Sequence, residues 1–197
     1  MAKNADLAVP RDPVQEYQDL MAAIGRIVVG AAALEYCVAV LVALTEGHRD
    51  RAAEDRALQL IQEAGAPVRE LGQLAAGPPE RRDLKGLLRE AEAVLDERNF
   101  VVHAIPLEDI TVGEQGGLIG WHPRTGQEIR LTTPAVLGHV QDLRIAWRRF
   151  DEAIAAAASQ AGIRRVIRRP GAFAGPPWGP APRPPGVPDH GRHLRPA

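Results

Sequence analysis

Apolar residues recur along the first third of the chain with the period of an α-helix. Asp12 and Pro13 form a helix-start signal, because aspartate caps a helix and proline is tolerated in its first turn. One apolar stripe then repeats at alternating spacings of four and three residues: Leu20, Ile24, Ile27, Ala31, Leu34, Val38 and Leu41. Other faces carry valines and alanines as well. We therefore predict a long helix from Pro13 to about Gly47 at the centre of a bundle.

The same segment is long enough to be considered as a membrane span. Between Ile27 and Leu44 the only ionisable residues are Glu35, Tyr36 and Cys37. A carboxylate in the middle of a span is costly, and many of the apolar residues here are alanine or glycine. We therefore favour the central bundle helix and expect no membrane association. The polar first residues contain no signal-peptide core, which predicts a cytoplasmic protein.

Shorter apolar periods predict three further helices, at about residues 51–64, 67–77 and 79–105. Asp50 is the predicted cap of the first of these, and its Leu58, Leu60 and Ile61 are expected to face inward. The helix that begins at Pro79 has the strongest amphipathic pattern, and it is expected to stop before residue 106.

Between residues 109 and 131 the pattern changes from helical to strand-like. The short pieces ITV, LIGWH and EIRL are separated by glycine-rich and turn-forming segments, which predicts a small antiparallel hairpin or three-strand meander. Thr133 and Pro134 then repeat the cap-and-proline signal and start a last long helix to about Gln160, with an extension to Ile167 after a break at Gly162 as an alternative. The fold class is therefore mainly α: a bundle of four to five helices with a β insertion before the last one.

The formal net charge of -1 conceals an uneven distribution along the chain. Residues 1–143 carry 14 basic and 22 acidic side chains, whereas residues 144–197 carry 10 arginines and three acidic residues. From Pro170 onward, 9 prolines and 5 glycines occur among the last 28 residues, which is typical of disorder. We therefore expect a flexible N-terminus at 1–12, the bundle at 13–167 and a disordered tail at 168–197.

Cofactor and metal signals are absent from the sequence. A single cysteine, Cys37, excludes an intramolecular disulfide and a thiolate metal cluster. His48, His122 and His139 lie far apart without metal-ligand spacing, and no glycine-rich segment has the pattern of a phosphate-binding loop. We therefore expect neither a metal ion nor a cofactor.

The core-facing stripe of the fourth predicted helix includes one charged residue, Arg98. This stripe consists of Leu84, Leu88, Ala91, Leu95, Arg98 and Val102. A guanidinium cannot lose its proton to escape burial, so Arg98 requires an anionic partner or access to solvent. Glu35, within the apolar run of the first helix, is the candidate partner. We hypothesise that the two side chains pair across the bundle, and the simplest interpretation of such a pair is structural.

Arg98 is followed directly by Asn99 and, five residues later, by His103. On a helix Asn99 and His103 are four residues apart and therefore neighbours. Here the sequence resembles the higher-eukaryote-and-prokaryote nucleotide-binding (HEPN) family. The signature of that family is an arginine and, four to six residues on, a histidine, often with a polar residue directly after the arginine. The resemblance extends over about residues 13–167, although one short segment carries it and the β insertion departs from the minimal family pattern.

The resemblance implies a metal-independent endoribonuclease that acts as a homodimer, with the motifs of both subunits lining a groove for RNA. It implies that His103 is the general acid or base, that Arg98 stabilises the phosphorane and that Asn99 holds the phosphate or the imidazole. Glu35 would orient Arg98, and the product would be a 2′,3′-cyclic phosphate. Family members often act as toxins or in antiviral defence, which implies an antitoxin or other protein partner.

Two further features bear on partners. A basic cluster that could contact RNA phosphates consists of Arg164, Arg165, Arg168 and Arg169, and a solvated helix end explains it equally well. The tail contains a proline-rich stretch at residues 180–185 that suits polyproline recognition. The alternative function is therefore a non-catalytic bundle that binds nucleotides or a protein partner.

Overall fold

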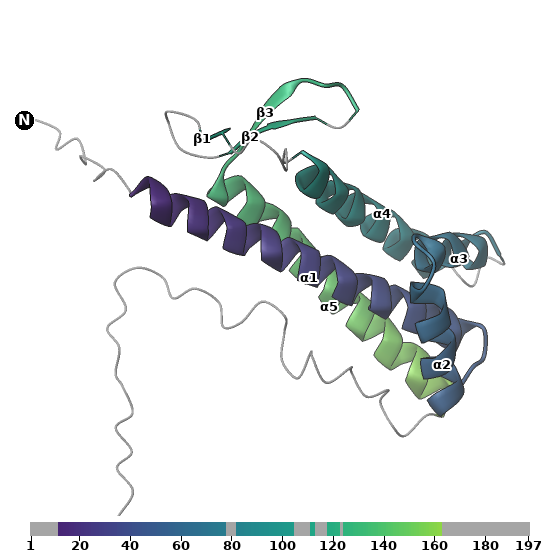
Figure 1. Cartoon of the computed structure of the whole chain (residues 1–197). Helices are drawn as coiled ribbons and strands as arrows, with labels where there is room; N and C mark the ends of the chain where they lie inside the picture. The colour runs from purple at the N-terminus through teal and green to yellow at the C-terminus, as the bar shows by residue number, and fades with distance from the viewer. Residues whose placement is uncertain (1–11, 78–81, 105–110, 113–117, 123, 163–197) are drawn as a thin grey trace, which may run out of the picture.

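A computed structural model describes residues 12–77, 82–104, 111–112, 118–122 and 124–162 of the chain. Within these residues it contains five helices and three short strands (Figure 1). The helices are α1 (Pro13–Thr45), α2 (Asp50–Ile61), α3 (Ala66–Ala75), α4 (Arg82–His103) and α5 (Thr133–Gln160). The strands are β1 (Thr111–Val112), β2 (Leu118–Trp121) and β3 (Glu128–Leu131). The predicted mainly α bundle with a small β insertion is confirmed.

Helix α1 begins and ends at the predicted places. The Asp12 carboxylate accepts a hydrogen bond from the backbone N–H of Val14 at 3.0 Å, so it caps the helix as expected. After the last helical residue, Gly47 adopts a φ of 93°, which a side chain at that position would strain. The two local signals at the ends of α1 therefore fix its length.

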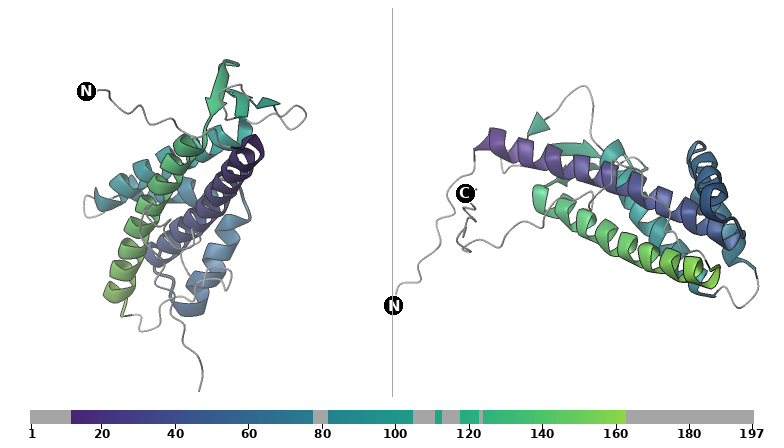
Figure 2. Two further views of the ribbon diagram at one scale, coloured as in Figure 1. Left: turned by 90° about the vertical axis from the view of Figure 1, so that its left-hand side faces the viewer. Right: turned by 90° about the horizontal axis from the view of Figure 1, so that it is seen from below.

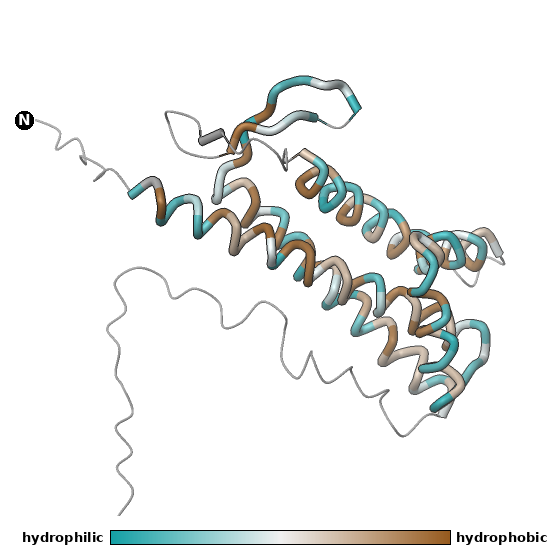
Figure 3. Tube along the Cα trace, viewed as in Figure 1, coloured by the Kyte–Doolittle hydropathy of each residue, from teal (hydrophilic) through white to brown (hydrophobic). Residues whose placement is uncertain are grey.

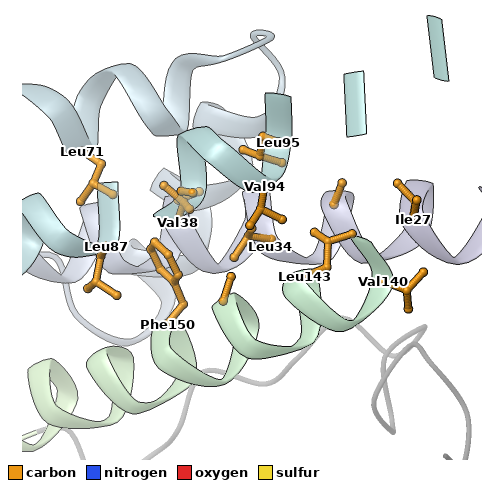
Figure 4. Packing of buried hydrophobic residues seen from close by; sticks show 14 of the residues in the cluster. Ile27, Leu34, Val38, Leu71, Leu87, Val94, Leu95, Val140, Leu143 and Phe150 are labelled. Carbon is orange, nitrogen blue, oxygen red and sulfur yellow. The ribbon is translucent and has the colours of Figure 1, made fainter. Parts of the chain in front are cut away.

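Helix α1 is the central element of the bundle. Helix α5 lies alongside it in the same direction and α4 runs the opposite way, as two further views show (Figure 2). The predicted apolar stripe from Leu20 to Leu41 is buried along its whole length. Figure 4 shows its Ile27, Leu34 and Val38 among buried side chains of α3, α4 and α5, including Phe150. Close packing of this stripe therefore holds the helices together.

The central helix α1 is buried on all sides only in its C-terminal half. Every residue from Val38 to Leu44 is buried, because α2 and α3 cover this end of the helix in addition to α4 and α5. Nearer the N-terminus, Met21, Val28 and Val29 remain 38%, 45% and 44% exposed. Figure 3 shows the hydropathy of each residue of α1, and the bundle buries the apolar residues of its C-terminal half more completely than those of its N-terminal half.

Among the described helices, α1 is the one long and apolar enough to cross a membrane. Of the residues in its most apolar window, 72% are buried inside the bundle. Burial against the other helices accounts for the hydropathy of that window, as it does for a core helix.

Helix α2 differs from the prediction in its cap and in its inner face. Arg49 precedes the first helical residue without a side-chain cap, and Asp50 itself has a φ of 48°. Leu58 and Ile61 are 46% and 41% exposed, so their predicted inward orientation is wrong, whereas Leu60 is buried as expected. The buried positions are Ala53, Ala57 and Leu60. Small alanines allow α2 to approach α1 closely, while Leu58 and Ile61 lie on its outward face.

The bounds of the remaining helices agree with the sequence, with small shifts. Helix α3 covers residues 66–75, and the predicted start of α4 at Pro79 lies outside the described residues. The cap of α5 is Thr132 rather than Thr133, because the Thr132 hydroxyl accepts from the backbone N–H of Ala135 at 3.4 Å. The predicted flexible N-terminus, the extension to Ile167 and the tail also lie outside the described residues.

The strands form a three-stranded antiparallel sheet in the order β1-β2-β3, which is the meander of the two predicted alternatives. Strand β2 packs directly on the end of α4, where the backbone N–H of Trp121 donates to the carbonyl oxygen of Ala104 at 2.9 Å. A side chain at Gly120 would collide with that same carbonyl group. Gly120 is therefore required for the sheet to lie against the end of α4.

We expect Gly120→Ala to lower the free energy of unfolding by about 1–3 kcal/mol, since the added methyl group forces β2 away from Ala104. Gly86→Ala is the matched control, because nothing lies within 4 Å of a Cβ at this helical glycine. It should raise stability by about 0.5–1 kcal/mol. Urea denaturation of both variants measures the two effects, and equal stability of Gly120→Ala and wild type would contradict the required close approach.

Candidate active site at the end of helix α4

The predicted ion pair between Arg98 and Glu35 is present. The Arg98 Nη2 atom donates to Glu35 Oε1 at 2.6 Å and joins α4 to α1 across 63 positions of sequence. The two side chains retain 27% and 34% exposure, so the pair lies at the edge of the core rather than inside it. The pair is therefore anchored but still accessible to solvent.

One nitrogen of Arg98 remains without a partner. Its Nε atom is buried and has no hydrogen-bond partner among the described residues. A buried donor of this kind costs free energy unless a ligand or water satisfies it. Arg98 therefore keeps hydrogen-bonding capacity beyond its contact with Glu35.

Asn99 and His103 lie in the last turns of α4, and both are exposed. They line a pocket of about 450 Å³ between the end of α4 and the turn that joins β2 to β3. Its lining consists of Asp96, Glu97, Asn99, Phe100, His103, His122 and Arg124. A volume in this range suits a small ligand or part of a larger one.

The structure does not place all three motif residues in one pocket of a single chain. Asn99 and His103 line the pocket together, as their spacing predicts. Arg98 lies on the neighbouring face of α4, where it contacts α1 through Glu35, and it does not line this pocket. Arg98 and His103 of one chain therefore lie on different faces of α4. For both side chains to contact one phosphate, the substrate would have to reach both of these faces, or a second chain would have to supply one of the two residues.

His122 is a residue of this pocket that the sequence did not reveal. Its Nδ1 atom accepts hydrogen bonds from the backbone N–H groups of Arg124 and Thr125, each at 3.2 Å. Its ring packs on Phe100 of α4 with centroids 5.1 Å apart and planes tilted by 60°. In the sequence His122 ends the strand-like piece LIGWH directly before a turn, but only the tertiary contact with α4 makes it a site residue.

Both carboxylates of the pocket have basic neighbours. Arg124 Nη2 lies 3.6 Å from Asp96 Oδ2, with both side chains largely exposed. His139 Nδ1 of α5 lies 3.0 Å from Glu97 Oε2. The exposed pair with Asp96 contributes little free energy because water screens it. The Arg124 guanidinium nevertheless reduces the negative potential that the pocket presents to an anion.

Glu97, His139 and Asp142 bring one ligand atom each within 4.8 Å of one another. A histidine nitrogen with two carboxylates has the donor chemistry for a divalent ion. The hydrogen bond between His139 and Glu97 already accounts for the closeness of two of the three. Sequence reasoning missed this group because α4 and α5 lie far apart along the chain.

The basic cluster of four arginines at residues 164–169 falls outside the described residues. Comparison of the chain with protein-family models, with curated proteins and with solved structures finds no match. The likeness to the HEPN family therefore rests on Arg98, Asn99 and His103 alone.

A double-mutant cycle should detect the ion pair between the two helices. We expect Glu35→Gln and Arg98→Met to show a coupling free energy of unfolding of about 1 kcal/mol, since the pair is short but only partly buried. The matched pair is Asp96→Asn with Arg124→Met, whose side chains are 67% and 78% exposed and should show almost no coupling. Equal coupling of the two pairs in urea denaturation would contradict a specific role of the contact with Glu35.

Proposed function

We propose that this chain is a metal-independent endoribonuclease of the HEPN type that acts as a cytoplasmic homodimer in toxin–antitoxin or antiviral systems. The observation that carries the proposal is the pairing of Glu35 with Arg98 on the helix that ends at the exposed His103. A guanidinium held by a carboxylate and an imidazole at the end of the same helix are suited to act on a phosphodiester. Asn99 adds an exposed amide beside His103.

In this proposal His103 takes the proton of the ribose 2′-OH, since imidazole suits general acid–base work near neutral pH. The 2′-oxygen then forms a bond to phosphorus while the bond to the 5′-oxygen breaks. The leaving 5′-oxygen takes a proton from water, and His103 later returns its own proton to solvent. Arg98 stabilises the negative charge that grows on the phosphoryl oxygens, and Glu35 fixes its orientation. Asn99 holds the phosphate or the imidazole. The products are a 2′,3′-cyclic phosphate and a free 5′-hydroxyl.

A second copy of the chain would cover the apolar face that α1 exposes. Met21, Gly25, Val28 and Ala32 are all exposed and follow one another at spacings of four, three and four residues, and the next position of this stripe is Glu35. An isologous contact along the stripe would bring the Glu35–Arg98 pairs of two chains towards a shared two-fold axis. The dimer therefore offers a way to bring Arg98 and His103 to one substrate.

The dimer is tested by a charge placed in the stripe. We expect Val28→Lys to yield a monomer in light scattering at micromolar concentration, because the ammonium would be buried without a partner. Leu58→Lys is the matched control, since Leu58 on α2 is 46% exposed against 45% for Val28 and lies away from the stripe. A wild-type monomer, or a dimer that survives Val28→Lys, would count against this interface.

Cleavage is tested on the purified full-length chain with single-stranded RNA in the presence of a chelator. We expect wild type to cleave and His103→Ala to lose about 10²- to 10⁴-fold in rate, which is the usual contribution of a general acid or base. His48→Ala is the control, because His48 is an exposed histidine beyond the end of α1.

Two results would redirect the interpretation. Loss of cleavage in the chelator would argue for a metal ion, for which Glu97, His139 and Asp142 are the place to look. Unchanged cleavage by His103→Ala would remove His103 from the mechanism.

The second candidate function is a non-catalytic bundle that binds a nucleotide or a protein partner such as an antitoxin. Two observations favour it: Glu35 already neutralises Arg98, and the pocket contains two carboxylates that repel phosphate. The proline-rich stretch at 180–185 would then add a binding segment. Absence of cleavage by wild type would favour this function.

A further inference from the structure

The imidazole of His122 is held in place from several sides. Two backbone N–H groups of the following turn bind its Nδ1 atom, and its ring packs on Phe100. Its own backbone N–H donates to the carbonyl oxygen of Gln127 at 2.7 Å, which closes the hairpin. The preceding residue, Trp121, is hydrogen-bonded to the end of α4. The His122 side chain is therefore held in a defined orientation directly after β2.

These hydrogen bonds also determine where the ring carries its proton. A nitrogen that accepts from N–H donors has no hydrogen of its own, so in the neutral ring the hydrogen is on Nε2. In this tautomer His122 presents Nε2–H as a hydrogen-bond donor.

The His122 donor lies in the same pocket as the motif residue His103, although His122 directly follows β2 and His103 ends α4. Strand β2 is fixed to Ala104, the residue that directly follows His103. The β insertion therefore adds a second imidazole to the end of α4, where a plain helical bundle would have none.

The other hydrogen-bond donors near this pocket are less well placed to bind a phosphate oxygen. Arg98, the motif cation, does not line it, and Arg124 is an exposed side chain beside Asp96. Asn99 is exposed as well. Among the donors that line the pocket, His122 is the one whose orientation is set by several contacts.

We propose that His122 is a further catalytic residue, whose Nε2–H donates a hydrogen bond to a non-bridging oxygen of the scissile RNA phosphate. This role rests on the proposed ribonuclease function. As the 2′-oxygen bonds to phosphorus and the bond to the 5′-oxygen breaks, charge on the non-bridging oxygens grows and the hydrogen bond strengthens. His122 transfers no proton, and proton transfer remains with His103.

The test uses a short RNA with a single scissile linkage, made with oxygen or with sulfur at one non-bridging position in each of its two stereoisomers. Sulfur accepts hydrogen bonds poorly, so wild type should cleave one phosphorothioate isomer more slowly than the oxygen substrate. His122→Asn is the test variant, because an Asn side-chain oxygen can accept from the same backbone N–H groups of the turn. The amide is too short to replace Nε2–H.

We expect His122→Asn to cleave the oxygen substrate about 10²- to 10³-fold more slowly than wild type, with no additional loss on the sulfur isomer. Its pH–rate profile should keep the wild-type shape, since His103 sets it. Its melting temperature and circular dichroism should match wild type. A merely structural role for His122 would lower the rate on both substrates equally and leave the sulfur effect intact.

Three results would overturn the assignment in different ways. A wild-type rate in His122→Asn, or a sulfur effect of undiminished size, would remove the hydrogen bond to phosphate while the ribonuclease function stands. A displaced limb of the pH–rate profile would make His122 a proton-transfer group instead. Failure of wild type to cleave either substrate would overturn the ribonuclease function itself, and the role of His122 with it.

Discussion

Helix α1 carries more apolar surface than any single neighbour can cover, and the rest of the fold is arranged around it. Helix α5 packs along it, while α2 and α3 close around its C-terminal half, where every residue from Val38 to Leu44 is buried. The apolar stripe from Leu20 to Leu41 is the surface of α1 on which the other helices pack. Because the cover is incomplete, α1 leaves Val28 and Val29 exposed.

Glu35 places a charge in the middle of this apolar helix, and the candidate site depends on how that charge is paired. A carboxylate at the edge of the core requires a cation, and Arg98 of α4 supplies it. The contact joins α4 to α1 at the edge of the core, where buried apolar side chains hold the two helices together. His103 and the pocket lie at the end of α4, and the β meander then adds His122 to the same end.

The parts of this arrangement that depend on short-range rules could be predicted from the sequence. The cap at Asp12 and the stripe of α1 are local patterns, and Arg98 was identifiable because a charge on an apolar stripe needs a partner. The parts that depend on which elements meet were missed. Leu58 faces outward while alanines of α2 pack on α1, and His122 gains its place only from the docking of β2 on α4. The hydrogen bond between His139 and Glu97 could likewise not be predicted from the sequence, because it depends on how α4 and α5 pack together.

The chemical form of the RNA ends tests the central claim most directly. After incubation of RNA with the full-length chain in a chelator, mass spectrometry of the fragments should find 2′,3′-cyclic phosphates and 5′-hydroxyl ends. These ends should form about 10²- to 10⁴-fold more slowly with His103→Ala. Intact RNA, or fragments with 3′-hydroxyl ends, would contradict an endoribonuclease in which His103 activates the ribose 2′-oxygen.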